Sequence, residues 1–406
     1  MLTQIYKDSM LRVFSIILGL GINILITRSL TLEERGVFGL IMNDANLIAQ
    51  IFNFGIHTSA LIILTKNHQK AIEYSNVSLV LIILAIISYL IWTQLFSSFS
   101  IITVFTIFTS ITNLWSIFFN SGYTAIGKSK FFNISEIVKN IIICTLLLIL
   151  CKISSELLTI YLIYIPLNLI FCAILTICFQ KVSCKKSFKN FKFWTNNYKV
   201  SIKSYISCGL SSAFTWYAIH FAKIQQEEGI ITGKMLGQFI LSFNHIAYIM
   251  IFFTSISLIF TPHLIIQDDK KKILKRVFVL IFLNLLVLSI GIIIVYPWME
   301  DIFSFIYGEK YRISGWYFKK MLPICYSTVF LLSIAPFITA FKVPLISIIS
   351  PGLSLLSFII FTQFLINTSS VIEIIDSYFY SIFIWCLLYT GFLIKTLFNI
   401  YHCKST

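Results

Sequence analysis

Twelve apolar runs, each about as long as a membrane-crossing helix, restrict the fold of this chain more than any other feature. A helix needs about 20 apolar residues to cross the hydrocarbon core of a bilayer. The runs cover residues 10–30, 37–64, 76–96, 102–126, 135–151, 157–179, 205–224, 237–262, 277–298, 321–341, 344–366 and 377–397. The sequence therefore predicts an all-α polytopic membrane protein with 12 transmembrane helices.

The composition supports this prediction. The chain has 406 residues, of which 58% are hydrophobic and 12% are charged, whereas soluble domains are about 45–50% apolar and about 25% charged. A soluble enzyme, a secreted disulfide scaffold and a disordered protein are therefore excluded. The nine cysteines are odd in number and form no C-x-x-C motif, so we interpret them as reduced packing residues.

Motifs for catalysis and cofactor binding are absent from the sequence. It has no Walker A motif, no G-x-S-x-G, no H-E-x-x-H and no G-x-G-x-x-G, and no cluster of side chains has the spacing of metal ligands. The connections between the apolar runs are too short for a catalytic domain. The sequence therefore predicts a transport protein rather than an enzyme, with no cofactor and no metal.

The basic residues are distributed unevenly between the two sides of the predicted spans. With the N-terminus in the cytoplasm, 22 of the 31 Lys and Arg residues fall on the cytoplasmic side and 9 on the other side. Cytoplasmic loops carry the excess of Lys and Arg, so both termini are predicted to be cytoplasmic. The net charge of +15 thus reflects loop asymmetry rather than nucleic-acid binding. No cleavage site follows Lys7 and Arg12, so we expect a retained first span.

A lysine-rich segment separates the sixth and seventh runs at the middle of the chain. We interpret residues 181–204 as a basic cytoplasmic linker between an N-terminal six-helix lobe, residues 1–180, and a C-terminal six-helix lobe, residues 205–406. Paired halves of this kind are common in transporters, which bind substrate between them. The alternative is that the segment only anchors the topology at an anionic membrane surface.

The second run carries a row of polar side chains. Its members are Asn43, Asn46, Gln50, Asn53 and His57, with Asp44 beside them. Their spacing of three and four residues puts them on one helical face. Lipid cannot satisfy amide groups, so the row must face other helices or a hydrated cavity. We favour the cavity, because a row of amides is too polar for packing alone.

Similar rows occur in other runs. They include Arg12 and Asn23 in run 10–30, Asn113 and Asn120 in run 102–126, and Trp216, His220 and Lys223 in run 205–224. Two readings stay open for Arg12 and Lys223, which lie near the ends of their runs: they face a cavity, or they snorkel to the membrane surface. Run 344–366 carries a row of serines, which we interpret as residues of ordinary helix–helix contacts.

Three segments resemble a known family of membrane exporters. They are ITRSLTLEERGVFGLI between the first two runs, FNFGIHTSALIILTK at the end of the second, and FIYGEKYRISGWYFKKML after the ninth. These resemble the polysaccharide-export branch of the multidrug/oligosaccharidyl-lipid/polysaccharide (MOP) exporter superfamily, in which an Arg-Leu-Leu-Gly-Pro-Glu-Glu-Tyr-Gly turn joins the first two spans. Leu32 and Arg35 stand where that turn has Pro and Tyr, whereas Gly308 and Tyr311 match the family's Phe-Gly-x-x-Tyr segment.

The resemblance implies both a fold and a cargo. The implied fold is MATE-like, with two six-helix lobes around a central cavity that opens alternately to each side. Of the family's members, the Wzx-type O-antigen flippases fit best; they carry an undecaprenyl-pyrophosphate-linked repeat unit from the cytoplasmic to the periplasmic leaflet of the bacterial inner membrane. The implied partners are this lipid-linked oligosaccharide, membrane lipids, and an O-antigen polymerase with a chain-length regulator.

The polar rows meet the requirements of such a cargo. A pyrophosphate carries about two charges and cannot cross hydrocarbon unaided, and cationic side chains bind it through charge-assisted hydrogen bonds. Amides and hydroxyls exchange hydrogen bonds with a glycan. The side chains expected to bind substrate are Arg12, Asn23, Asn46, Gln50, Asn53, His57, Asn113, Asn120, Lys139, Trp216, His220 and Lys223. Asp44 is the candidate for coupling transport to a proton or sodium ion.

Two other functions stay open. An O-antigen polymerase is also long and apolar, but it usually has a sizeable outer loop with catalytic arginines, whereas the longest loop here is basic and predicted to be cytoplasmic. A cation-coupled drug exporter of the same superfamily is the second alternative, with Asp44 as its cation site.

Overall fold

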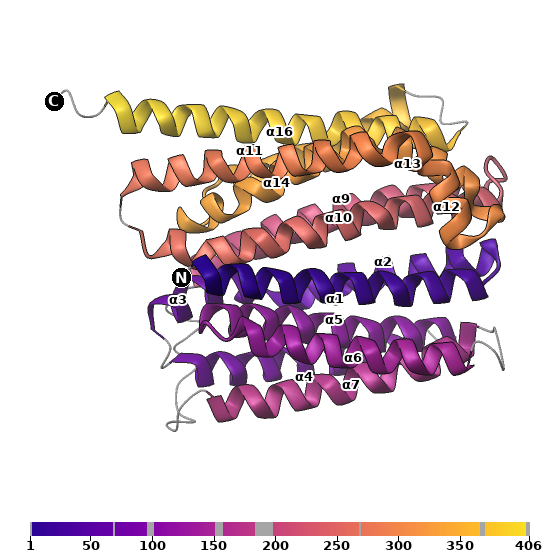
Figure 1. Ribbon diagram of the computed structural model, residues 1–406, viewed down its shortest axis with the longest axis horizontal. Helices are drawn as coiled ribbons and strands as arrows, with labels where there is room; N and C mark the ends of the chain where they lie inside the picture. The colour runs from indigo at the N-terminus through magenta and orange to yellow at the C-terminus, as the bar shows by residue number, and fades with distance from the viewer. Residues whose placement is uncertain are drawn as a thin grey trace. The chain divides into compact units, whose positions relative to one another are not determined.

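The computed structural model describes residues 2–67, 70–95, 101–150, 157–182, 198–267, 269–365 and 370–402. In these ranges every regular element is a helix (Figure 1). The chain divides into two compact units, an N-terminal unit of Met1–Ser212 and a C-terminal unit of Ala213–Thr406. The predicted all-α polytopic membrane fold is confirmed.

The N-terminal unit is built from long helices that lie side by side. They are α1 (Leu2–Ser29), α2 (Leu32–Asn53), α3 (Ile56–Lys66), α4 (Ala71–Leu95), α5 (Ile101–Ala125), α6 (Ser129–Leu150), α7 (Leu157–Val182) and the first half of α9 (Tyr198–Glu227). Helix α1 packs along α6, α2 packs along α5, and α7 packs against both α5 and α6. Apolar side chains fill the space between them, including Phe105 and Tyr161, whose rings stack with centroids 4.1 Å apart.

Helix α2 begins and ends at residues whose chemistry explains its limits. The Thr31 hydroxyl accepts from the Glu34 backbone N–H, and the Glu34 carboxylate accepts from the Thr31 N–H, which satisfies two donors at the helix start. At the other end, Phe54 and Gly55 both have positive φ, which no helix interior accommodates. The predicted second span, 37–64, is therefore a pair of helices, α2 and α3, bent by 54°.

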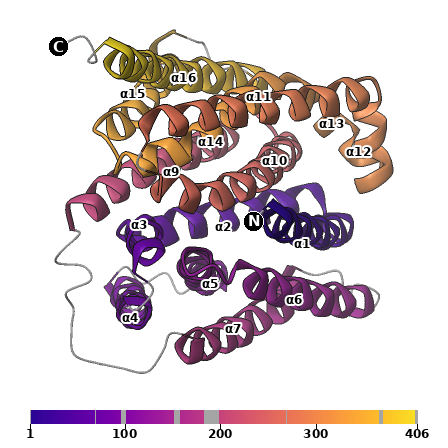
Figure 2. The ribbon, with the colours of Figure 1, turned by 60° about the vertical axis from the view of Figure 1, so that its left-hand side comes forward.

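The C-terminal unit contains the second half of α9 and the remaining helices (Figure 2). These are α10 (Gly233–Ile265), α11 (Lys270–Val295), η2 (Tyr296–Trp298), α12 (Met299–Tyr307), η3 (Glu309–Tyr311), α13 (Arg312–Lys320), α14 (Leu322–Ala340), α15 (Ile346–Ile360), η4 (Phe361–Leu365) and α16 (Val371–His402). Helix α14 packs against α10, α11 and α16, and α15 packs along α16. Buried apolar side chains lie between these helices, among them Phe239, Val329 and Phe358.

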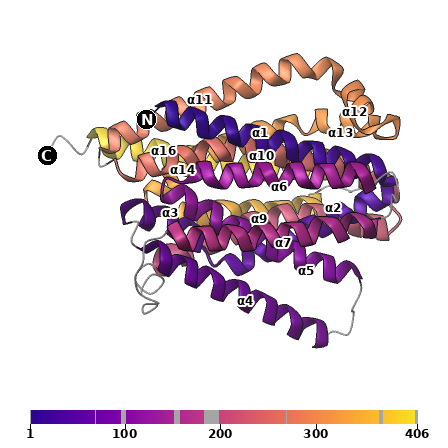
Figure 3. The same cartoon turned by 60° about the horizontal axis from the view of Figure 1, so that its bottom comes forward.

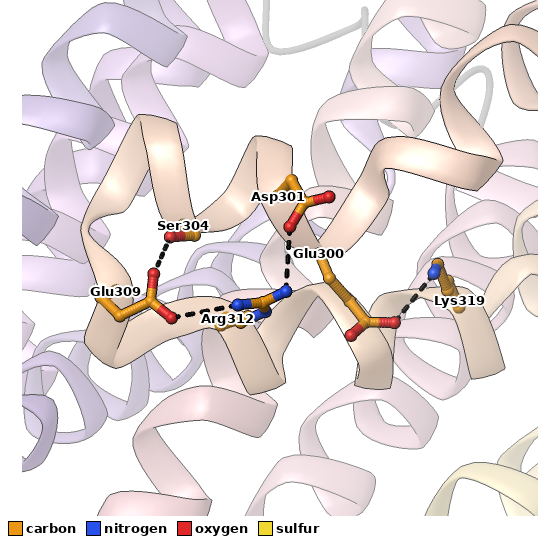
Figure 4. Close-up of polar contacts among 6 residues, drawn as sticks. All are labelled: Glu300, Asp301, Ser304, Glu309, Arg312 and Lys319. Atoms are coloured by element: carbon orange, nitrogen blue, oxygen red, sulfur yellow. Dashed lines mark hydrogen bonds and ion pairs between the residues drawn. The ribbon is translucent and has the colours of Figure 1, made fainter.

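The segment after α11 is folded, although the sequence predicted only a connection there. The short helices α12 and α13 lie at one end of the long helices (Figures 1 and 3). They approach closely, because a Cβ at Gly315 would lie 2.6 Å from the Glu300 Cα. Ion pairs reinforce the contact, with Lys319 Nζ 2.8 Å from Glu300 Oε1 and Arg312 Nη2 3.1 Å from Asp301 Oδ1 (Figure 4). We call α12, η3 and α13 the cap.

The number of membrane-spanning helices differs from the predicted twelve. Ten helices of the described residues are long and apolar enough to cross a bilayer, or eleven if the bent pair α2–α3 is one span. The predicted span at 205–224 lies in α9, which is helical but is not one of the ten. Most of the predicted linker, residues 183–197, lies outside the described residues, and residues 198–204 form about the first two turns of α9. The lobe limits at 180 and 205 stay a prediction.

Candidate functional site

The amide row of α2 is only partly exposed. Asn46 is exposed, and Asn43 and Gln50 are half-buried. Asn113 of α5 donates from Nδ2 to Asn46 Oδ1 over 2.7 Å, so two of the predicted side chains contact each other. Amides at this depth of a spanning helix require polar surroundings, and this pair supplies only one hydrogen bond of the several that the two amides can form.

The row continues through the bend between α2 and α3. The Asn53 Nδ2 group lies 3.3 Å from Gln50 Oε1 and 2.5 Å from His57 Nδ1, so its two N–H groups can donate to both neighbours. The Thr58 hydroxyl lies 3.2 Å from His57 Nε2, on the other side of the imidazole. Three of the predicted binding residues thus form one hydrogen-bonded chain, and Asn53, at its centre, is fully buried.

The start of α9 packs on this bend through small and hydroxylated side chains. Ser59 Oγ lies 2.6 Å from Ser201 Oγ, and Ser204 Oγ donates to Thr58 Oγ1 over 2.6 Å. A Cβ at Gly55 would lie 2.1 Å from the Ser201 carbonyl oxygen, so only glycine permits the approach. The bend therefore both orients His57 and holds α9.

A charged cluster lies inside the N-terminal unit, between α1, α6 and α7. Lys139 Nζ is 2.6 Å from Glu136 Oε2, and the two side chains are only 13% and 19% exposed. The charge of Arg12 on α1 interacts with Glu136, and that of Lys139 interacts with Tyr164 on α7. Lys139 is near the middle of α6. Ionised side chains at this depth are costly and usually functional, and this cluster has two cations for one carboxylate.

Arg35 is the largest fully buried side chain of the N-terminal unit, although its position in the sequence suggested a loop charge. Its Nε donates to Thr27 Oγ1 over 3.0 Å, its Nη2 donates to Asn23 Oδ1 over 3.3 Å, and its guanidinium carbon lies 5.3 Å from the Phe38 ring centroid. These contacts fix the end of α1 to the start of α2. Asn23, predicted to bind substrate, is placed in contact with this arginine.

The predicted residues of α9 belong to the C-terminal unit. The Trp216 and His220 rings stack, with centroids 4.5 Å apart and planes inclined by 14°. Lys223 Nζ lies 3.3 Å from Glu227 Oε1. The three side chains are half-buried and share one side of the helix. They form a group separate in the chain from the predicted residues of the N-terminal unit.

Two predicted residues, Asp44 and Asn120, lie outside these groups. Asp44 is half-buried near the middle of α2, beside the amide row, and makes contacts there. Asn120 is half-buried on α5, and its Oδ1 has no hydrogen-bond partner among the described residues. Substrate binding by any of the predicted side chains, and ion coupling by Asp44, stay predictions.

Several residues of these groups were not found from the sequence. Glu136 had a local signal, since it precedes Lys139 by three residues and so shares its helical face. Ser201 and Ser204 had none, because their partners lie 142 and 146 residues earlier in the chain. Arg35 was counted as a loop charge, and only its packing shows otherwise.

Other polar side chains are explained by packing. Ser350 and Ser354 of α15 are fully buried, and each donates to the carbonyl four residues earlier. His245 of α10 lies 2.8 Å from the Leu241 carbonyl through Nδ1 and 2.8 Å from the Tyr307 hydroxyl through Nε2. A neutral imidazole that donates at Nδ1 and accepts at Nε2 satisfies both contacts, so His245 ties α10 to the cap.

These features define a multi-pass helical membrane protein with the fold of MATE transporters. Solved structures establish the fold. A MATE protein in the straight conformation has a TM-score of 0.71 at 12% identity, covering 99% of this chain and 97% of that chain. A MOP superfamily transporter from Pyrococcus furiosus, described as having a binding pocket of reverse polarity, has a TM-score of 0.70 at 11% identity, covering 99% and 96%.

A third structure agrees with the first two. It is an outward-facing multidrug resistance MATE family transporter of the MOP superfamily, with a TM-score of 0.66 at 12% identity, covering 99% of this chain and 96% of that chain. No protein-family model matches the chain, and no curated protein matches it by sequence. At 11–12% identity these likenesses show the fold alone.

Proposed function

We propose that the protein is an alternating-access transporter that moves a lipid-linked oligosaccharide from the cytoplasmic to the periplasmic leaflet of the bacterial inner membrane. The fold supports a transporter, because the solved structures that share it include a transporter in its outward-facing state. The resemblance to the polysaccharide-export branch supports the class of cargo. In this proposal both termini are cytoplasmic, and a polymerase and a chain-length regulator act on the delivered units.

The charged cluster of Arg12, Glu136 and Lys139 is the observation that carries this proposal. Its two cations and one carboxylate leave one positive charge inside a membrane-spanning unit. The dielectric constant of such a site is lower than that of water, so the electrostatic interaction between a unit charge and a charged ligand is stronger there. A diphosphate is attracted there and an organic cation is repelled. The Pyrococcus furiosus transporter, for which reversed pocket polarity suggests a different function, is a parallel case.

The amide row supplies the second requirement of the cargo. Asn46 is exposed and Asn113 and Gln50 are half-buried, and the Asn46–Asn113 pair uses one hydrogen bond of the several that its amides can form. A glycan offers many hydroxyl groups, which exchange hydrogen bonds with such amides in place of water. The polyprenyl tail needs no binding site, since it can remain in lipid.

Deletion in the native host tests the proposal. Glycolipids are extracted and the surface polysaccharide is separated on a gel. We expect loss of both polymer and single-unit core, with lipid-linked repeat units retained on the cytoplasmic side. Loss of polymer with single-unit core retained would indicate a polymerase instead, and an unchanged gel would contradict transport of this cargo.

A cation-coupled drug exporter is the second candidate function. One observation favours it: Asp44 lies near the middle of α2, at a depth where a carboxylate can take up a proton or sodium ion. A solved structure with this fold is described as a multidrug resistance transporter. Efflux of fluorescent lipophilic cations separates the two functions, because a flippase deletion leaves that efflux unchanged whereas loss of a drug exporter lowers it.

A further inference from the structure

Helix α9 is as long as a membrane span but is not apolar enough to be one alone. Its 30 residues extend about 45 Å, yet it is not one of the ten described helices that are apolar enough to cross a bilayer alone. Polar side chains on a helix at membrane depth must face protein, water or a polar ligand. One side of α9 therefore borders something other than lipid.

The packing of the C-terminal unit identifies that side. Phe214 and Ala218 are buried, and the Phe214 ring stacks on Tyr378 of α16 with centroids 4.4 Å apart. At about 100° per residue, Trp216 and Lys223 lie on the opposite side of α9 from this buried face. They are half-buried, as is His220 between them. These three side chains therefore lie away from the face of α9 that packs on α16.

Trp216 and His220 form an ordered aromatic surface. Parallel stacking at 4.5 Å holds the indole against the imidazole, so little rotamer freedom remains to be lost when a ligand binds. The faces of aromatic rings carry negative charge density, and the C–H groups on one face of a pyranose ring are weakly positive and apolar. A sugar ring is therefore a matching ligand, with the imidazole as a hydrogen-bonding neighbour.

Lys223 adds an anion-binding group one helical turn beyond His220. Its ion pair with Glu227 spans 3.3 Å, and the side chains are 39% and 57% exposed. Exposed pairs of this kind contribute only about 0–1 kcal/mol, so a diphosphate can displace the carboxylate. Three residues of helix rise about 4.5 Å, which suits a diphosphate joined directly to a sugar that rests on the aromatic surface.

We propose that Trp216, His220 and Lys223 form a binding subsite for a sugar diphosphate, in which the two rings take the sugar and the lysine takes the diphosphate. The subsite rests on the proposed function, because it identifies residues that bind the cargo's head group. The same chemistry occurs in a polyprenyl-diphosphate sugar and in a nucleoside-diphosphate sugar, and binding experiments distinguish these two sources.

The test measures binding to the full-length protein in lipid nanodiscs. The probes are a radiolabelled polyprenyl diphosphate with one N-acetylglucosamine, the same lipid without sugar, and UDP-N-acetylglucosamine. We expect Trp216→Leu to lower affinity for the sugar-bearing lipid about tenfold, or about 1.4 kcal/mol, and to leave affinity for the sugar-free lipid unchanged. Lys223→Met is expected to lower affinity for both lipids. A Trp216-dependent signal with UDP-N-acetylglucosamine would show that the lipid is not needed for recognition.

Two control variants match the two test variants. Trp385→Phe changes a half-buried tryptophan of α16 that makes no hydrogen bond through Nε1 among the described residues. Lys234→Met removes an exposed lysine at the start of α10. Both controls are expected to bind all probes as the wild type does. Trp216→Phe keeps a ring that can stack on His220 and is expected to retain most of the affinity. It therefore shows whether a loss of binding in Trp216→Leu comes from the missing ring or from misfolding.

The result that overturns the subsite is a Trp216→Leu protein that binds the sugar-bearing lipid like the wild type, or that loses the same affinity for both lipids. The proposed function is tested separately, by measuring whether wild-type protein in proteoliposomes flips the sugar-bearing lipid. Binding that depends on Trp216 without flipping would reject the flippase and keep the subsite. Flipping that is unchanged when Trp216 or His220 is substituted would reject the subsite and keep the flippase.

Discussion

Gly55 shows how much one residue decides at the α2–α3 bend. Its φ of +67° suits glycine, and a Cβ would lie 2.1 Å from the Ser201 carbonyl oxygen and 2.6 Å from the Tyr205 backbone nitrogen. We expect Gly55→Ala to cost about 1–3 kcal/mol or more, because it combines backbone strain with overpacking. Thermal unfolding of purified protein in detergent measures the change.

Gly209→Ala is the matched control for the Gly55 substitution. Gly209 lies in α9 with nothing within 4 Å of an added Cβ, and alanine favours a helix by about 1 kcal/mol over glycine. The control is therefore expected to melt at or above the wild-type temperature. An equal loss of stability in both variants would show that the Gly55 contact is not the cause.

The pair of Glu136 and Lys139 allows stability and function to be separated. Glu136→Gln leaves a cation with little exposure and no carboxylate, and breaking such a pair costs about 3–5 kcal/mol. Replacing all three charged members of the cluster, as in Glu136→Gln with Lys139→Met and Arg12→Met, removes that cost together with the positive charge. We expect the triple variant to regain a melting temperature near the wild type but not to flip lipid-linked sugar in proteoliposomes. Wild-type flipping by the triple variant would remove the cluster from the proposed mechanism.

At the scale of elements, the sequence predicted the positions of the spanning helices but not the bend in the second span or the short helices of the cap. Apolar runs predict helices because lipid demands satisfied backbone groups, and each predicted run has a helix in the structure. The break at Phe54 and Gly55 was missed, since the polar row of period 3.6 runs through it without interruption. The cap was missed because α12 and α13 have only nine residues each, and their stability comes from contacts with each other and with α10.

The cap is also an element whose stability depends on pH. The Ser304 hydroxyl and Arg312 both donate to Glu309 (Figure 4), and these hydrogen bonds lower the pKa of that carboxyl below its ordinary value of 4.5. A lowered pKa contributes stability that is present above the ordinary value and is lost as pH falls through the lowered one. We expect hydrogen-exchange protection factors in α12 and α13 to fall below about pH 4.

A variant checks the origin of this pH dependence. Glu309→Gln cannot titrate, so its protection factors in the cap are expected to be lower at neutral pH and to change less on acidification. The protection of α14, which contributes no residue to the ion pairs of the cap, provides an internal reference. A cap in the Glu309→Gln variant that still loosens with the wild-type profile would assign the effect to another carboxylate.

At the scale of the whole molecule, the sequence predicted which side chains share a helical face but not which faces meet. The rows of α2 and α9 follow from spacing alone. The contacts of Asn46 with Asn113 and of Thr58 with Ser204 join residues 67 and 146 positions apart, and no local pattern specifies them. The loop charges predicted the orientation of the chain by a different physical principle, which is the cost of moving Lys and Arg across a membrane. This orientation can be tested directly.

Cysteine labelling in intact spheroplasts tests the predicted orientation with four exposed positions, two in each unit. In a variant whose native cysteines are serine, we expect Arg28→Cys and Lys234→Cys to react with a membrane-impermeant maleimide, and Lys66→Cys and Lys271→Cys to react only after permeabilisation. The reverse pattern would contradict cytoplasmic termini. The expected pattern places Arg12 toward the cytoplasmic end of α1 and Lys223 toward the periplasmic end of α9. A diphosphate moving outward would then meet one cation near entry and another before release.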